Sequence, residues 1–169
     1  MGYTTDFEGS FQITPTLKEE HKQYLITFSK KRRMKRDSIK CEAFNDPIRQ
    51  AVELPIGIEG EFTVFGDEDL FSNDSSIIDH NLPSPTQPGL WCQWIPMEDG
   101  NALVWDGAQN FYNYIEWLEY LKTSFFEPWG YTLSGTMKWN GQGYNDTGTI
   151  TVDNNIITTK KGWNYGIHN

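Results

Sequence analysis

The sequence has no long hydrophobic run, and its longest apolar stretches are only a few residues long. A membrane-spanning helix needs roughly 20 apolar residues, so we expect no membrane partner. Cysteine is scarce, with only Cys41 and Cys92 among 169 residues. The first residues, MGYTTDFEGS, have neither the basic nor the apolar segment of a signal peptide. These features favour two reduced thiols in a cytoplasmic protein.

Motifs of common catalytic sites are also missing. No glycine-rich phosphate loop, serine elbow or pair of carboxylates stands out. Because the chain has only three histidines and two cysteines, we expect no zinc site and predict no metal, cofactor or catalytic residue. A small hydrolase or transferase that uses Asp79 and His80, or Cys92, is kept as an alternative, although a cysteine and a histidine alone fit many folds.

Positive charge is scarce in most of the chain. Residues 1–49 hold ten basic and seven acidic side chains, whereas residues 50–169 hold four and sixteen, for a net charge of −9. The acidic majority would repel long nucleic acid. A basic segment within an acidic protein instead marks one place where a small anion could bind. The acidic surface itself offers an alternative function, as a mimic of nucleic acid or an inhibitor that docks on a basic host protein.

Aromatic residues are abundant, with seven Trp, eight Tyr and ten Phe, and their patterns predict the elements. Alternating or short apolar segments favour strands, and apolar residues at helical spacing favour helices. Thr16 and Glu19 have the spacing of a capping box for the first helix, and Asp106 is the expected cap of the second. The expected strands are 6–13, 61–65, 90–95, 102–106, 131–139, 147–152 and 156–159, and the expected helices are 16–30 and 108–126.

These elements predict an α+β fold: an antiparallel sheet of about five to seven strands with two main helices packed on one face. We expect a single domain over residues 1–162 and a flexible tail at 163–169. The second helix carries an additional aromatic stripe of Tyr112, Trp117 and Tyr120. Cover by the same chain is the favoured explanation, and a homo-oligomer through these three residues is the alternative.

Six of the seven residues at 30–36, KKRRMKR, are basic. Arginine presents a planar guanidinium that suits phosphate and other anions. We therefore predict that Arg32, Arg33 and Arg36 bind an anionic ligand. The competing interpretation is a solvated charge run that complements the negative C-terminus of the preceding helix.

A second candidate segment, NLPSPTQPGLWCQW at 81–94, ends a long loop that begins at residue 66. Strand alternation places Cys92 and Trp94 with Leu90 on one side, which predicts core positions. It places Trp91 on the other side, where its ring could stack on a base. The ring and edge contacts of a ligand are predicted to be Asn81, Gln87, Trp91 and Gln93.

Four stretches resemble a family of small bacterial and phage proteins: GYTTDFEGSF, RRMKR, QPGLWCQW, and WDG followed by FYNYIEWLEYL. The resemblance covers a third to a half of the chain and implies a compact soluble protein without implying an activity. Relatives tend to have tyrosine where His80 stands, which argues against an essential His80. A phage protein in a bacterial host cell would have reason to sequester a host signal or to block a host factor.

The resulting hypothesis is a non-catalytic binding protein for a small anionic, nucleotide-like ligand. Its partner would be that ligand or a host protein, and its activity would be of an anti-defence type. Arg32, Arg33 and Arg36 would contact the anion, while the four residues of the second segment would contact the ring.

Overall fold

The computed structural model describes residues 2–66 and 74–162. Over these residues it confirms the α+β class, with a six-stranded antiparallel sheet and two helices of 11 and 8 residues. The chain forms two compact units. The sheet unit contains the described residues of 1–17, 93–111 and 121–169, and the helical unit contains those of 18–92 and 112–120. A single domain stays a prediction, and the predicted tail at 163–169 lies outside the described residues.

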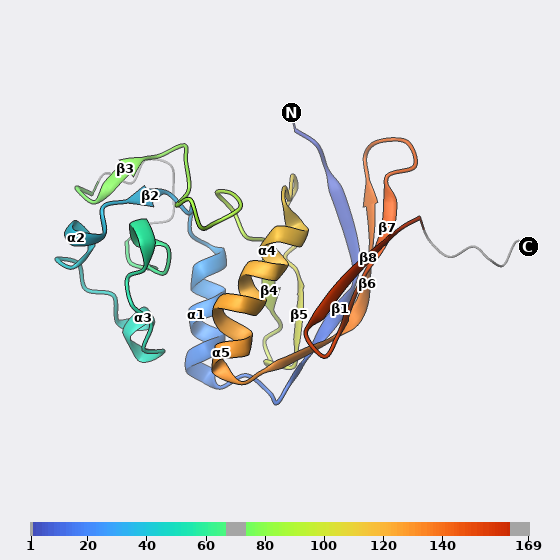
Figure 1. Ribbon diagram of the computed structural model, residues 1–169, viewed down its shortest axis with the longest axis horizontal. Coiled ribbons are helices and arrows are strands. Elements are labelled where there is room, and N and C mark those ends of the chain that lie inside the picture. The colour runs from blue at the N-terminus through green and yellow to red at the C-terminus, as the bar shows by residue number, and fades with distance from the viewer. Residues whose placement is uncertain (1, 67–73, 163–169) are drawn as a thin grey trace, which may run out of the picture. The chain divides into compact units, whose positions relative to one another are not determined.

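The sheet unit is built on six strands whose neighbours all pair antiparallel. Figure 1 labels these strands. This number confirms the predicted range of five to seven. In spatial order the strands are β4 (Trp94–Pro96), β5 (Ala102–Trp105), β1 (Thr5–Thr14), β6 (Thr132–Gly141), β7 (Thr147–Asp153) and β8 (Ile156–Lys161). The predicted hairpin across Asp99-Gly100 is confirmed by the pairing of Trp94 with Trp105.

The two longest strands, β1 and β6, lie side by side in the middle of this sheet, and each has one glycine where the other strand approaches closely. Gly9 faces Met137, and Gly135 faces Phe11. The alternating pattern buries Phe11 and Ile13 while Gln12 between them stays exposed. Period-2 alternation in the sequence therefore predicted both the strands and their buried faces.

Trp94 is the centre of the aromatic core of the sheet unit. Its ring contacts Phe7 at 5.1 Å, Phe111 at 5.0 Å and Phe11 at 6.0 Å between ring centroids, all in edge-to-face geometry. Trp94 is 1% exposed. This confirms the prediction that Trp94 is a core residue.

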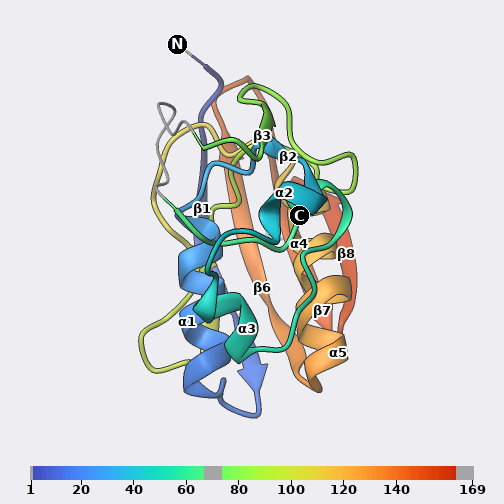
Figure 2. The same cartoon turned by 90° about the vertical axis from the view of Figure 1, so that its left-hand side faces the viewer.

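The helical unit is made of short elements joined by irregular chain. Figure 2 shows its α1 and α3 side by side. The elements are α1 (Glu19–Ser29), β2 (Lys35–Arg36), α2 (Ser38–Cys41), α3 (Pro47–Ala51), a 3-10 turn (Ile58–Gly60), β3 (Ile77–Asp79) and α4 (Tyr114–Leu121). Strands β2 and β3 pair antiparallel as a separate two-stranded sheet.

The predicted start of the first helix is wrong. Helix α1 begins at Glu19 after Lys18, and no side chain caps it. Thr16 instead donates its hydroxyl hydrogen to Asn101 Oδ1 at 2.6 Å. The Leu17 amide donates to the Gly100 carbonyl at 3.0 Å. These bonds within the sheet unit hold residues 16 and 17 outside the helix, so the capping box does not form.

The second helix is also shorter than predicted. Asp106 accepts a hydrogen bond from the Ala108 amide in a local turn, and α4 begins only at Tyr114. After α4 the chain continues through a π-helical segment (Lys122–Phe126) and α5 (Glu127–Trp129), which ends at Gly130 with a positive φ of 87°. A side-chain oxygen that bonds its own loop cannot cap a helix that begins eight residues later.

The strand predicted at 61–65 is absent from the described chain, and these residues are irregular. The carbonyl of Glu61 accepts hydrogen bonds from the side chains of Arg33 and Gln87. The carbonyl of Thr63 accepts a second bond from Arg33. Arginine and glutamine side chains thus take the positions that a neighbouring strand would otherwise occupy.

The aromatic stripe of α4 is mostly covered by its own chain. Trp117 is fully buried and packs edge-to-face on Phe28 of α1 at 6.0 Å between ring centroids. Tyr120 stacks on the same ring at 6.3 Å. Only Tyr112 is exposed. Cover by the same chain therefore accounts for Trp117, and an oligomer through the stripe stays a prediction.

In the residues that the structure describes, no helix has the length and apolar character needed to cross a membrane. Cys41 and Cys92, both in the described chain, are buried and form no disulfide.

Candidate functional site

The basic segment at residues 30–36 and the loop at residues 76–90 form one local structure in the helical unit. The Arg33 amide donates to the Leu90 carbonyl at 2.8 Å, and the Lys35 amide donates to the Leu82 carbonyl at 2.8 Å. The β2–β3 pair extends this connection, since Lys35 pairs with Asp79. The two segments that the sequence marked as candidates therefore lie next to each other.

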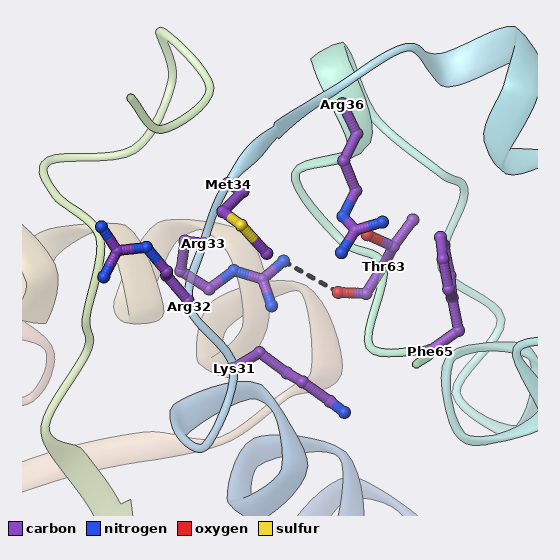
Figure 3. Close-up of a pocket in the computed structure, with 7 residues that line it drawn as sticks. All are labelled: Lys31, Arg32, Arg33, Met34, Arg36, Thr63 and Phe65. Carbon is purple, nitrogen blue, oxygen red and sulfur yellow. Dashed lines mark hydrogen bonds between the residues drawn. The ribbon is translucent and has the colours of Figure 1, made fainter. Parts of the chain in front are cut away.

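The arginines of the basic segment point in different directions. Figure 3 shows the guanidinium groups of Arg33 and Arg36 directed into a small hollow, while Arg32 points the opposite way. The hollow has a volume of about 10 Å³, about enough for one water molecule. The residues that line it are Lys31, Arg32, Arg33, Met34, Arg36, Thr63 and Phe65.

Arg33 is 4% exposed. Its Nη2 atom donates to the carbonyls of Glu61 and Thr63, both at 2.8 Å. Its guanidinium carbon lies 4.1 Å from the centroid of the Phe28 ring, in a cation–π contact. Burial lowers the pKa of Arg33, because removal from water disfavours the charged form. Arg33 therefore links α1 to residues 61–63 inside the helical unit.

Arg36 is 6% exposed and forms a buried ion pair. Its Nη1 atom donates to Asp74 Oδ2 at 2.8 Å and to the Ser76 hydroxyl at 2.7 Å. Its guanidinium lies 4.7 Å from the Phe65 ring centroid. Burial raises the pKa of Asp74, but hydrogen bonds from Ser76 and Arg36 outweigh this effect, so the pKa stays below its usual value.

Asp74→Asn is expected to lower the free energy of unfolding at neutral pH by about 1–3 kcal/mol, because Arg36 loses its buried charge partner. The native carboxylate has a depressed pKa, so its contribution is present above the unfolded pKa and is lost as pH falls through the folded pKa. The difference between Asp74→Asn and the wild type should therefore shrink as the pH falls below about 4, the usual pKa of an aspartate. Urea unfolding across pH measures it, with exposed Asp153→Asn as control. A difference independent of pH would contradict this role.

Arg32, Asn81 and Trp91 are the predicted contacts that face solvent. Arg32 Nε donates to the His80 carbonyl at 2.9 Å, and its Nη2 lies 3.4 Å from Asn81 Oδ1. Within the described chain, Arg32 Nη1 and Asn81 Nδ2 make no hydrogen bond, so both can donate to a ligand. Trp91 follows Leu90 and is 38% exposed. These three residues present a cation, an amide and a ring.

Gln87 is buried in a polar network beneath the loop. Its Nε2 donates to the Glu61 carbonyl at 2.7 Å and to the Tyr120 hydroxyl at 3.0 Å. Tyr120 in turn donates to Glu61 Oε1 at 2.8 Å, and Thr86 donates to the same oxygen at 2.8 Å. Burial and the Glu61 carboxylate raise the pKa of Tyr120 above its usual value. Gln87 therefore anchors the loop to α4 from inside.

Gln93 belongs to the sheet unit, whereas the other six predicted residues belong to the helical unit. Its Nε2 donates to the Gln109 carbonyl at 3.1 Å, and its Oε1 accepts from Trp105 Nε1 at 3.3 Å. Gln93 is buried. These bonds explain how a glutamine fits on the outer side of the segment, a position that the sequence pattern left without a structural role.

The residues that the enzymatic alternative would use, Asp79, His80 and Cys92, take part in hydrogen bonds that hold the loop or lie in the core. Asp79 Oδ1 accepts from the Asn81 amide at 2.8 Å, the His80 carbonyl accepts from Arg32, and Cys92 is fully buried. Among the described residues, no group of three or more His, Cys, Asp or Glu side chains could hold a metal ion. Turnover of any substrate that survives loss of both His80 and Cys92 would exclude these residues as catalytic groups.

Two residues that line the hollow were not predicted as site residues from the sequence. Thr63 and Phe65 belong to the segment that alternation predicted as a strand, where they drew no attention as site residues. Phe65 packs on Arg36 and stacks on Phe44 at 4.7 Å between ring centroids. An aromatic residue near a basic segment in space carries no local signal in the sequence.

Comparisons of the chain with protein-family models, with curated proteins and with solved structures found no match. The resemblance to small bacterial and phage proteins stays a prediction. The site is therefore interpreted from its own residues.

Proposed function

We propose that the protein is a non-catalytic binding protein for a small anionic, nucleotide-like ligand. Arg32 contacts the anionic group, since its Nη1 atom has no partner in the described chain. Trp91 stacks on the planar ring of the ligand. Asn81 donates from Nδ2 to an acceptor on the edge of that ring. The three residues form the exposed side of the basic segment and its loop.

The observation that supports this proposal best is the bond from the Arg33 amide to the Leu90 carbonyl at 2.8 Å. It holds the residue after Arg32 beside the residue before Trp91. The bond from Arg32 Nε to the His80 carbonyl then positions Arg32 beside Asn81. A guanidinium held in place loses less conformational entropy when it binds a ligand.

Three other predicted contacts take a supporting part in this proposal. Arg33 and Arg36 hold the basic segment from the buried side, and Gln87 holds the loop. Their substitution would disturb the site through its backbone. Gln93, which belongs to the other unit, is left out of the proposed site.

The resemblance to bacterial and phage proteins supports a biological role for such binding. In a bacterial cytoplasm the protein would sequester a nucleotide-like host signal and so act against a host response. This role follows from binding alone, because a sequestering protein needs affinity and abundance but no turnover.

Binding can be tested with a panel of mono-, di- and cyclic nucleotides in a thermal-shift assay. A ligand at about 100 times its Kd should raise Tm by about 5–10 °C. Arg32→Ala and Trp91→Ala should each weaken its binding by about 10-fold or more, by loss of the anion contact or the ring stack. Lys30→Ala, which removes an equal charge from an exposed position, is the matched control. Equal weakening by Lys30→Ala, or no stabilisation by any nucleotide, would refute the proposal.

A second candidate function, binding of a host protein, is favoured by an open groove between α1 and α3. The groove has a volume of about 460 Å³ and mixes acidic with apolar side chains. Its lining residues are Glu19, Glu20, Gln23, Pro47, Ile48 and Ala51. Such a groove suits a peptide of the host protein that carries positive charges and one apolar side chain. In that case Ile48→Asp would abolish capture of the host protein, and Arg32→Ala would leave it unchanged.

A further inference from the structure

Arg33 has a buried charge that the described chain leaves uncompensated. Both of its hydrogen bonds come from Nη2 and go to neutral carbonyls. Its Nε atom is buried and has no hydrogen-bond partner. Among residues 2–66 and 74–162, no carboxylate forms an ion pair with Arg33 within 4.0 Å.

This arrangement is costly for an arginine. A guanidinium remains protonated in a protein, and a buried charge without a partner of opposite sign is strongly unfavourable. Two carbonyls and the Phe28 ring offset part of this cost, but none of them carries a negative charge. Buried unsatisfied polar atoms are rare in folded proteins and call for a partner such as an ion or a water.

The hollow beside Arg33 has the size for such a partner. Its volume of about 10 Å³ admits one water-sized particle. Lys31, Arg33 and Arg36 all contribute to its lining, so its positive potential is high. Asp74 forms an ion pair with Arg36 and balances its charge, which leaves the charge of Arg33 without a partner among the described residues.

We propose that this hollow is a binding site for a single monatomic anion of the size of chloride, held beside Arg33 Nε. The apolar side chains of Met34 and Phe65 complete the lining of this hollow. A water molecule would satisfy Nε but would leave the charge of Arg33 uncompensated. The guanidinium of Arg32 points away from this hollow (Figure 3), so the anion site does not depend on the surface ligand proposed above.

The test compares chloride with gluconate, which is too large to enter, at constant ionic strength. Tm of the wild type should rise with chloride and saturate, by about 4 °C at about 20 times Kd. The protein should broaden the chlorine-35 NMR signal of chloride, and added bromide should reverse this broadening by competing for the site. A crystal grown in bromide should give an anomalous peak beside Arg33 Nε. The absence of this peak, with no difference between chloride and gluconate, would overturn the proposal and indicate a water.

A pair of variants assigns the effect to Arg33. Arg33→Met keeps an unbranched apolar side chain but removes the charge, so Tm should no longer depend on chloride. Lys30→Met, which removes the same charge from an exposed residue that does not line the hollow, should keep the full dependence. Chloride dependence that survives in Arg33→Met would refute the site. If Arg33→Met does not fold, the bromide peak in the wild type decides the question.

Discussion

Trp94→Ala is expected to lower the free energy of unfolding by about 3–5 kcal/mol, as do other large-to-small changes at buried aromatic residues. Trp94 is 1% exposed and contacts the rings of Phe7, Phe11 and Phe111. Its removal would leave a cavity lined by three rings. These rings cannot all close over the cavity, because β5 pairs with both β1 and β4 and keeps the backbones of those two strands apart.

Trp91→Ala is the matched control, three residues away in the same segment. Trp91 is 38% exposed, so its loss should change stability by only about 0.5 kcal/mol. Urea unfolding, monitored by circular dichroism, gives both values from the midpoint if the m-value is unchanged. Similar losses for the two variants would mean that Trp91 is also a core residue and is unavailable as a ligand platform.

Gly135→Ala is expected to lower the free energy of unfolding by about 2–4 kcal/mol. The causes are backbone strain and steric overlap where β6 pairs closely with β1. Gly135 has a φ of +147°, a conformation that residues with a Cβ rarely adopt. An added Cβ would lie 2.6 Å from the Ser10 carbonyl oxygen and 3.2 Å from the Phe11 Cα. Both are backbone atoms of β1, so they can move only if the central strand pair separates.

Gly107→Ala separates the strain of positive φ from the overlap. Gly107 also has a positive φ, +86°, but no atom lies within 4 Å of the position its Cβ would take. Its substitution should cost only about 1 kcal/mol. Unfolding of both variants in guanidinium chloride measures the difference. Equal losses of unfolding free energy would show that the short distance between β1 and β6 leaves room for a Cβ at residue 135.

The accuracy of the sequence predictions differs between the two units. Strands β1, β6 and β7 were located well because alternation of apolar and polar residues is a local pattern. The hairpin at Asp99-Gly100 was located for the same reason. The helices were placed less well, since the capping residues Thr16 and Asp106 bond to other partners. Tertiary contacts overrode the local preference at both helix starts.

The candidate site was found in part. Composition alone identified the basic segment, and alternation correctly separated exposed Trp91 from buried Trp94 and Cys92. The segment is not uniform, however. Arg33 and Arg36 are buried and bonded to internal partners, while Arg32 keeps a donor for a ligand. Charge density predicts where an anion is attracted, but it does not predict which side chains remain accessible.

By itself, the sequence determined the α+β class, the strand pattern, the aromatic core and the location of the positive charge, because each follows from neighbouring residues. Only the tertiary structure decided what the arginines do. The partners of Arg33 lie 28 and 30 residues away, and the carboxylate partner of Arg36 lies 38 residues away. Irregular chain brings them together, and its conformation depends on packing and hydrogen bonds that no local pattern encodes.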